Sequence, residues 1–310
     1  MSETSPKLID WIEQTTGKHE FYIEQLRKEA SDRNYYRVKS EDISYVVMEN
    51  TKNPETAANF LYASKLLKSS NVSVPEIYAF SEDLNFLLIE DLGNDVLDTN
   101  IILNSDEILD GALKELRKIY NVPLDVLKTH DQEVLLNQTS NFFSIFEYKN
   151  IHLDSNNQDK LNQLRHDLVG SLISQEYVPC HTDFERRNLL VFREKIYVID
   201  FQDLCMGPIG IDLASLVYEH QFNYEQEEIR VAIETHALES RLNHPETLIK
   251  DIHTALAHRS MRIIGTFIGY FKKGKLLNRQ KDIDLFIGRL ILALKELKIL
   301  ENYKFLEKLL

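Results

Sequence analysis

One stretch in the second half of the chain constrains the fold most, because it joins an ordered set of polar residues to a short β-type run. It begins with His181, Asp183 and Asn188, in the spacing H-x-D-x4-N. The apolar run Ile196–Ile199 follows and ends directly at Asp200. A strand over that run would carry the Asp200 carboxylate out of a sheet, toward the loop that holds Asp183 and Asn188. The order therefore predicts two carboxylates and one amide that converge at a single place.

This arrangement is the one that phosphoryl transfer requires. In H-R-D-x-x-x-x-N followed by D-F-G, the first Asp accepts the proton of the attacking hydroxyl, and the Asn and the second Asp hold magnesium on the phosphates. By this pattern Asp183 is the candidate catalytic base, and Asn188 and Asp200 are the candidate metal ligands. We expect His181 to hold the loop through hydrogen bonds. The alternative is a polar turn before a hairpin, with Asp183 and Asn188 capping turns and Asp200 in solvent.

Length and composition set limits on the class of protein. With 310 residues and 43% apolar content the chain can bury a sizeable core, and we expect two lobes. The formal charge of −13 argues against nucleic acid or an anionic membrane as partner. The N-terminus lacks the pattern of a secretory signal, and no run has the length of a membrane span. Cys180 and Cys205 are the only cysteines, which indicates no disulfide framework. We therefore expect a cytoplasmic protein, and a monomer.

The first third of the chain carries the signals of a small sheet with one helix, and the rest is mostly helical. The β-type runs are Tyr35–Val38, Ser44–Glu49, Pro75–Phe80 and Phe86–Glu90; the helical patterns run from Asn53-Pro54 to about Ser69, over Asp106–Tyr120 and Asn157–Ser174, and from Ile211 nearly to Leu310. These signals predict an α+β fold in two lobes. The β-rich lobe, residues 1–92, would bind nucleotide, and the mainly helical lobe, residues 93–310, would hold the catalytic and substrate-binding residues.

Several segments also resemble a known family. They are residues 30–37, 46–49, 74–76, 86–93, 181–190, 200–203, 207–209, 212–216 and 258–275. Together they are similar to the aminoglycoside-phosphotransferase-like branch of the protein-kinase fold. Within that branch, the segments 200–208 and 258–275 resemble the bacterial anomeric kinases of N-acetylmuramate and N-acetylglucosamine. The resemblance covers roughly residues 25–290, and it implies a bilobal protein-kinase-like fold.

The resemblance also implies a function and a set of contacts. It implies transfer of phosphate from ATP, with Mg²⁺, to the anomeric hydroxyl of an amino sugar in cell-wall recycling. The adenine edge would meet backbone near Glu90 and Leu92, and Arg33 and Arg37 are candidate cations for the phosphates. Substrate contacts would come from Asp183, Arg187 and Asp203. For the arginines the alternative is a solvated surface. Asp212 is expected to cap a helix over Leu213–His220 and to brace the catalytic loop.

Two departures from the kinase pattern leave other functions open. A lysine on the third strand of the small lobe normally pairs with the phosphates, but Met48 stands about where it would be. A glycine-rich loop is also missing from the sequence, and Ser31–Asn34 takes its place. These departures leave open a nucleotide-binding regulator without activity, an interpretation that the intact Asp183, Asn188 and Asp200 oppose. A kinase for another small alcohol or for an aminoglycoside is the other alternative.

Overall fold

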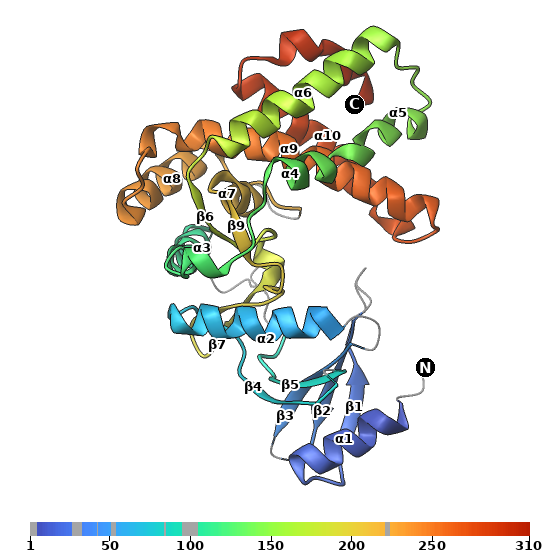
Figure 1. Cartoon of the computed structure of the whole chain (residues 1–310), viewed down its shortest axis with the longest axis vertical. Coiled ribbons are helices and arrows are strands. Elements are labelled where there is room, and N and C mark those ends of the chain that lie inside the picture. Colours follow the sequence, from blue (N-terminus) through green and yellow to red (C-terminus); the bar gives the residue numbers. More distant parts are fainter. Residues whose placement is uncertain are drawn as a thin grey trace. The chain divides into compact units, whose positions relative to one another are not determined.

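The computed structural model describes residues 5–26, 33–41, 43–50, 54–83, 85–94, 105–220 and 224–310 (Figure 1). Contacts between residues divide the chain into two units. The first unit contains residues 1–97 and 188–203, and the second contains residues 98–187 and 204–310. Asn53, expected to begin a helix, and Ser31 and Asp32 of the predicted phosphate loop lie outside the described residues.

The first unit is built on an antiparallel sheet of five strands in the order β1-β2-β3-β5-β4. In chain order its elements are α1 (Pro6–Thr16), β1 (Tyr22–Gln25), β2 (Asn34–Lys39), β3 (Ser44–Glu49), α2 (Pro54–Ser69), β4 (Ile77–Phe80) and β5 (Phe86–Glu90). The expected hairpin is present, because β2 and β3 pair antiparallel with Tyr36 opposite Val47. The helix over the segment after Asn53 and the two further strands are confirmed as well.

Side chains alternate across the sheet, as the pleat requires. One face packs on α1, where Leu8 and Ile12 form a buried cluster with Val38, Val47 and Phe86. Met48 is next to Val47 in β3 and belongs to the other face; it is fully buried. Met48, which stands about where kinases have a lysine, is therefore part of the apolar core.

Residues 188–203 also belong to the first unit. They form the hairpin of β7 (Leu189–Phe192) and β8 (Lys195–Val198), joined to the unit by a hydrogen bond from Val198 N to Ser73 O of 2.8 Å. The ring of Phe201 stacks on Phe60 of α2 with centroids 4.6 Å apart. The expected strand before Asp200 is thus present as β8. The expected boundary at residue 92 placed this hairpin in the other lobe, whereas the contacts assign it to the first unit. The functional roles expected of the two lobes stay a prediction.

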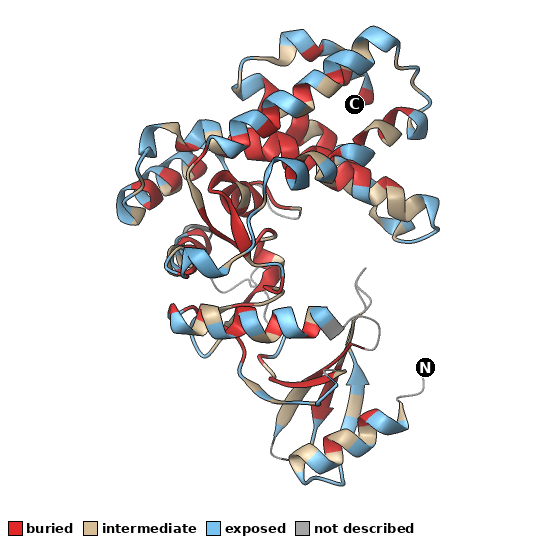
Figure 2. Cartoon of the chain, viewed as in Figure 1, coloured by how far each residue is buried: buried red, intermediate tan, exposed pale blue. Residues whose placement is uncertain are grey.

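The second unit is mainly helical. Its helices are α3 (Ser105–Ile119), α4 (Gln132–Gln138), α5 (Ser144–Tyr148), α6 (Ser155–Ile173), α7 (Gly210–Val217), α8 (Gln226–Ser240), α9 (Leu248–Lys272) and α10 (Gln280–Glu296), and β6 (Tyr177–Cys180) pairs antiparallel with β9 (Cys205–Pro208). The 25-residue helix α9 is buried along most of its length (Figure 2). It packs against α7 and α10, which makes it the centre of this unit's core.

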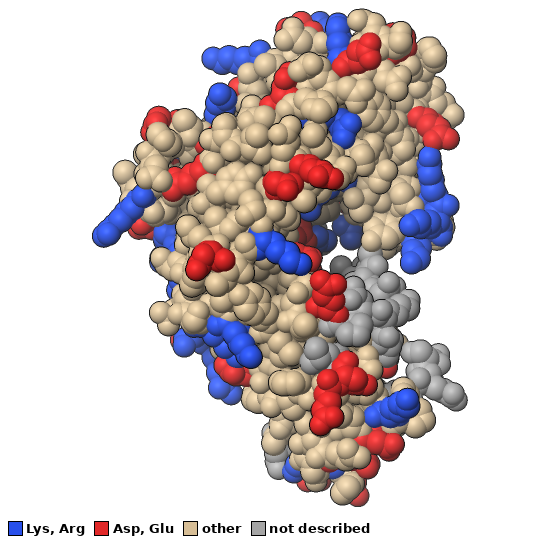
Figure 3. Space-filling view, viewed as in Figure 1, with Lys and Arg blue, Asp and Glu red and all other residues tan. Residues whose placement is uncertain are grey.

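Charge is distributed without segregation on the face shown in Figure 3, where acidic and basic side chains are interspersed. Among the residues that the structure describes, no helix has both the length and the apolar character needed to cross a membrane.

Candidate active site

The loop after β6 is fixed by Asp212. The backbone N–H groups of His181 and Thr182 donate to the two carboxylate oxygens of Asp212, at 2.6 and 2.7 Å. Thr182 has a positive φ of 75°, a backbone conformation that needs such support. Burial raises the pKa of Asp212 to about 6, against the opposing effects of His181 and the two N–H donors. The expected brace is therefore observed. The expected helix cap is wrong, because α7 begins at Gly210, before Asp212.

Asp183 follows in the same loop and is surrounded by cations. Arg187 donates to one of its oxygens at 2.8 Å, and Arg259 to the other at 3.5 Å. Burial alone would raise the pKa of Asp183, but Arg187, Arg259 and Arg262 together hold it below the usual range. The carboxylate is therefore ionised at neutral pH and accepts hydrogen bonds. Within the loop, Asp183 N also donates to His181 Nδ1 at 3.4 Å.

Glu185 forms the centre of a buried ionic cluster behind Asp183. It contacts Arg259, Arg187 Nε at 3.1 Å and His220 Nδ1 at 2.9 Å, and its side chain is 1% exposed. Arg259 Nε also donates to Ser215 Oγ at 2.9 Å. Burial lowers the pKa of His220, so its ring is neutral and donates to Glu185 from Nδ1–H. Arg187 and Arg259 are thus shared between Asp183 and Glu185, which fixes both guanidinium groups beside the loop.

Arg186 has a different partner from its neighbour Arg187. Its side chain is 5% exposed and lies 3.6 Å from the carboxylate of Glu219, which also accepts the Arg186 backbone N–H at 3.1 Å. The Arg186 side chain is therefore buried and not solvated. The side chain anchors the loop from inside the second unit.

The candidate metal ligands both belong to the first unit. Ile199 N donates to Asn188 O at 3.0 Å, so the residue before Asp200 lies beside Asn188. Asp200 has a positive φ of 60°, a region in which Asp is enriched among non-glycine residues. Arg33 donates to Asp200 Oδ1 at 3.1 Å, and the Asp200 side chain is 41% exposed. One carboxylate and one amide are the hard oxygen ligands that magnesium prefers, so the residues present fit a Mg²⁺ ion.

Glu90 and Leu92, the candidates for contacts to adenine, lie at the end of β5 and just after it. Arg37 is committed to Asp91 through two hydrogen bonds of 2.8 and 2.9 Å, and it donates to Gly93 O at 2.9 Å. Burial alone would raise the pKa of Asp91, but hydrogen bonds from Arg37 and Ser44 hold this pKa below its usual range. The pair fixes the segment that follows Glu90 and contains buried Leu92. Of the two candidate cations for the phosphates, Arg37 is buried, 5% exposed and paired with Asp91, and Arg33 is the one that contacts the candidate metal ligand Asp200.

Residues 23–246 match the phosphotransferase enzyme family. The chain belongs to this family. An N-acetylmuramate/N-acetylglucosamine kinase of Neisseria meningitidis is 30% identical over 230 residues, which are 71% of this chain and 68% of the relative. A kinase of the same name from Pseudomonas aeruginosa is 29% identical over 66% of this chain and 62% of its own length.

Two solved structures are similar in fold to this phosphotransferase. The choline kinase LicA from Streptococcus pneumoniae has a TM-score of 0.66 at 17% identity, and 94% of this chain and 98% of that chain are covered. The ADP-bound aminoglycoside phosphotransferase APH(2'')-Ib has a TM-score of 0.64 at 13% identity, over 94% of this chain and 97% of that chain. These likenesses confirm the α+β, protein-kinase-like fold with a sheet-based and a helical part.

The structure groups the residues that the sequence singled out into two sets. His181, Asp183 and Arg187 lie together in the second unit, and Asn188, Asp200 and Arg33 lie together in the first. Asp203 is exposed, and its carboxylate accepts a weak bond of 3.4 Å from Gln202.

Two important residues were not assigned a role from sequence. Glu185 lies two positions after Asp183, where nothing in the residue pattern marks it as buried. Arg259 lies 76 positions away from Asp183, within the segment 258–275 that carried the resemblance. The resemblance was the one signal available for Arg259.

Proposed function

We propose that this phosphotransferase is an ATP-dependent kinase that phosphorylates the anomeric hydroxyl of N-acetylmuramate and N-acetylglucosamine, in the recycling of cell-wall sugars. The observation that carries the proposal is its 30% identity, over 230 residues, to a kinase named for these two sugars. The ionised Asp183, supported by arginines in a braced loop, supplies the acceptor that such a reaction needs.

In the proposed mechanism, Asp183 orients the anomeric hydroxyl of the sugar and accepts its proton as the bond from oxygen to the γ-phosphorus forms. The bond between that phosphorus and the bridging oxygen breaks, and ADP leaves. Because the pKa of Asp183 is low, it is a weak base, and proton transfer comes late. This suits an anomeric hydroxyl, which is more acidic than an ordinary alcohol. Positioning therefore contributes more than basicity.

The nucleotide contacts are part of the same proposal. Asn188 and Asp200 hold the magnesium ion, which neutralises charge on the phosphates when bound. Arg33, at 3.1 Å from Asp200, is the preferred cation for the phosphates. Arg37 acts on the nucleotide indirectly, because its pairing with Asp91 holds the backbone at Glu90 and Leu92 where the adenine edge binds. Arg187 positions Asp183, and Asp203 accepts from sugar hydroxyls.

Charge around Asp183 disfavours a cationic acceptor such as an aminoglycoside. Arg187, Arg259 and Arg262 all act on Asp183 electrostatically, and they would repel ammonium groups on an acceptor. A neutral or acidic sugar meets no such repulsion. The alternative of another alcohol remains testable in the same assay.

The test is release of ADP from ATP and Mg²⁺ with each of several acceptors. We expect turnover with N-acetylmuramate and N-acetylglucosamine, and little with choline, glucose or an aminoglycoside. Asp183→Asn serves as the inactive control, and Asp125→Asn, at an exposed position, as the matched active control. Turnover restricted to the cationic acceptors would overturn the proposal.

A further inference from the structure

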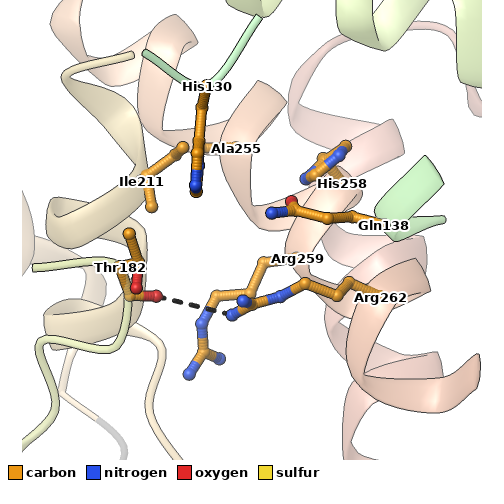
Figure 4. Close-up of a pocket in the computed structure, with 8 residues that line it drawn as sticks. All are labelled: His130, Gln138, Thr182, Ile211, Ala255, His258, Arg259 and Arg262. Carbon is orange, nitrogen blue, oxygen red and sulfur yellow. Dashed lines mark hydrogen bonds between the residues drawn. The ribbon is translucent and has the colours of Figure 1, made fainter. Parts of the chain in front are cut away.

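A hollow in the second unit opens beside the catalytic loop. It is lined by Thr182, which directly precedes Asp183, by Gln138 of α4, and by Arg259 and Arg262 of α9. Its empty volume is about 290 Å³, part of which is open to solvent. In Figure 4 the side chains of Gln138 and Arg262 extend from α4 and α9 toward the space between them and Thr182.

Arg262 is the cation of this hollow that is not committed to a carboxylate. Arg259, one helical turn before it, is held by Glu185 and Ser215. Arg262 makes a single long hydrogen bond of 3.5 Å, to Thr182 O. In the described part of the chain, no acidic side chain lies within ion-pair distance of Arg262. Its guanidinium is half-buried and keeps donors for a ligand.

The remaining lining residues make the hollow suitable for an anion with a polar substituent. No lining residue is acidic. His258 bonds Leu135 O through Nε2 at 2.9 Å, and burial lowers the pKa of its ring to about 4, so it is neutral. The Gln138 amide makes no hydrogen bond to any residue that the structure describes, and it offers both a donor and an acceptor.

We propose that Arg262 binds the lactyl carboxylate of N-acetylmuramate and thereby sets the preference for this acidic sugar over N-acetylglucosamine. The inference rests on the proposed function. A guanidinium fork matches a carboxylate through two parallel N–H···O bonds, and the pair is charge-assisted. Arg262 donates to Thr182 O at 3.5 Å, and Thr182 directly precedes Asp183, so a sugar whose anomeric hydroxyl meets Asp183 has its substituents within reach of Arg262. Gln138 pairs with a polar group of the same sugar.

The test is a comparison of both sugars as substrates of the wild type, Arg262→Met and Arg262→Lys. N-acetylglucosamine lacks the carboxylate and is the internal control. For Arg262→Met we expect the KM for N-acetylmuramate to rise about tenfold or more, the size of a charged hydrogen bond. We expect the KM for N-acetylglucosamine to change by less than about threefold on the same scale. Arg262→Lys should recover part of the loss, because it keeps the charge without the fork.

The outcomes separate this inference from the proposed function. Equal effects of Arg262→Met on both sugars would mean that Arg262 acts through Asp183, and the inference would be overturned while the kinase assignment stands. Wild type that turns over N-acetylglucosamine alone would overturn it too. Wild type that turns over neither sugar would overturn the proposed function and the inference with it. Arg230→Gln, at an exposed arginine of α8, is the matched control and should behave as wild type.

Discussion

At the scale of single residues, neighbours determine what each carboxylate does. Asp183 and Asp212 lie in the same part of the second unit, yet their pKa values move in opposite directions. Arginines surround Asp183 and keep it ionised. Asp212 is buried, which raises its pKa, and it accepts two backbone N–H groups. Asp212 therefore holds the loop, and in the proposed mechanism the ionised Asp183 accepts the proton.

Asp183→Asn should lower kcat by about 10²–10⁴-fold, because the amide keeps the shape of the carboxylate but cannot accept the proton. The affinity for ATP should change little. Steady-state kinetics together with nucleotide titration by fluorescence measure the two effects separately. Activity equal to that of wild type would show that Asp183 is not the acceptor.

Asp200→Asn should abolish turnover at ordinary magnesium concentrations, because a neutral amide holds the cation less strongly than a carboxylate. Raising the magnesium concentration should recover part of the rate. Arg33→Gln breaks the same ion pair but leaves the carboxylate in place, so it should raise the KM for ATP and leave the magnesium dependence unchanged. An unchanged magnesium dependence in Asp200→Asn would contradict the assignment.

At the scale of elements, α7 and α9 position the candidate catalytic loop. Asp212 of α7 binds two N–H groups of the loop, and Arg259 of α9 reaches Asp183 and Glu185. Both helices are buried against each other. Their packing is therefore part of the site.

Asp212→Ala should destabilise the protein and lower activity together. The substitution leaves two buried N–H groups without an acceptor, and each costs about 1–3 kcal/mol. Asp212→Asn should have a smaller effect, because its amide oxygen still accepts one of them. Urea unfolding gives the free energies. Stability equal to that of wild type in Asp212→Ala would show that the loop has another support.

Gly265→Ala should destabilise the second unit, because the added Cβ would lie 2.8 Å from the backbone carbon of Asn141. Gly269→Ala is a matched control in the same helix, where a Cβ would meet no atom within 4 Å. At that position alanine should stabilise by about 0.5–1 kcal/mol through helix propensity. Thermal unfolding of both variants measures the difference. Equal shifts would mean that α9 is not packed as described.

At the scale of the whole molecule, sequence periodicity predicted the helices and strands well, but it did not predict which distant segments contact one another. The hairpin of β2 and β3, the strand before Asp200 and the main helices follow from local signals. The return of residues 188–203 to the first unit does not, because contacts such as Phe201 with Phe60 join positions far apart in the sequence. The pairing of Arg37 with Asp91 could not be predicted either, because the two residues lie far apart in the sequence. The cap at Asp212 was predicted wrongly because α7 begins two residues earlier, at Gly210, and glycine gives no signal for the start of a helix.

Stability should depend on pH through Asp183. Its pKa is lower in the folded protein than in the unfolded chain, so the folded state binds fewer protons and stability rises with pH between the two values. The contribution is complete above the ordinary carboxylate pKa of about 4 and is lost as the pH falls below it. Wild type should therefore exceed Asp183→Asn in free energy of unfolding at neutral pH, and the gap should shrink below about pH 4. A gap that stays constant in acid would contradict the paired, ionised state of Asp183.

The most direct test of the central claim is phosphorus NMR of the product formed from ATP, Mg²⁺ and N-acetylmuramate. The account predicts a phosphate on the anomeric oxygen, seen as a signal coupled to the anomeric proton, and no such signal with Asp183→Asn. A phosphate on any other hydroxyl, or no product from either amino sugar while ATP binds, would contradict it.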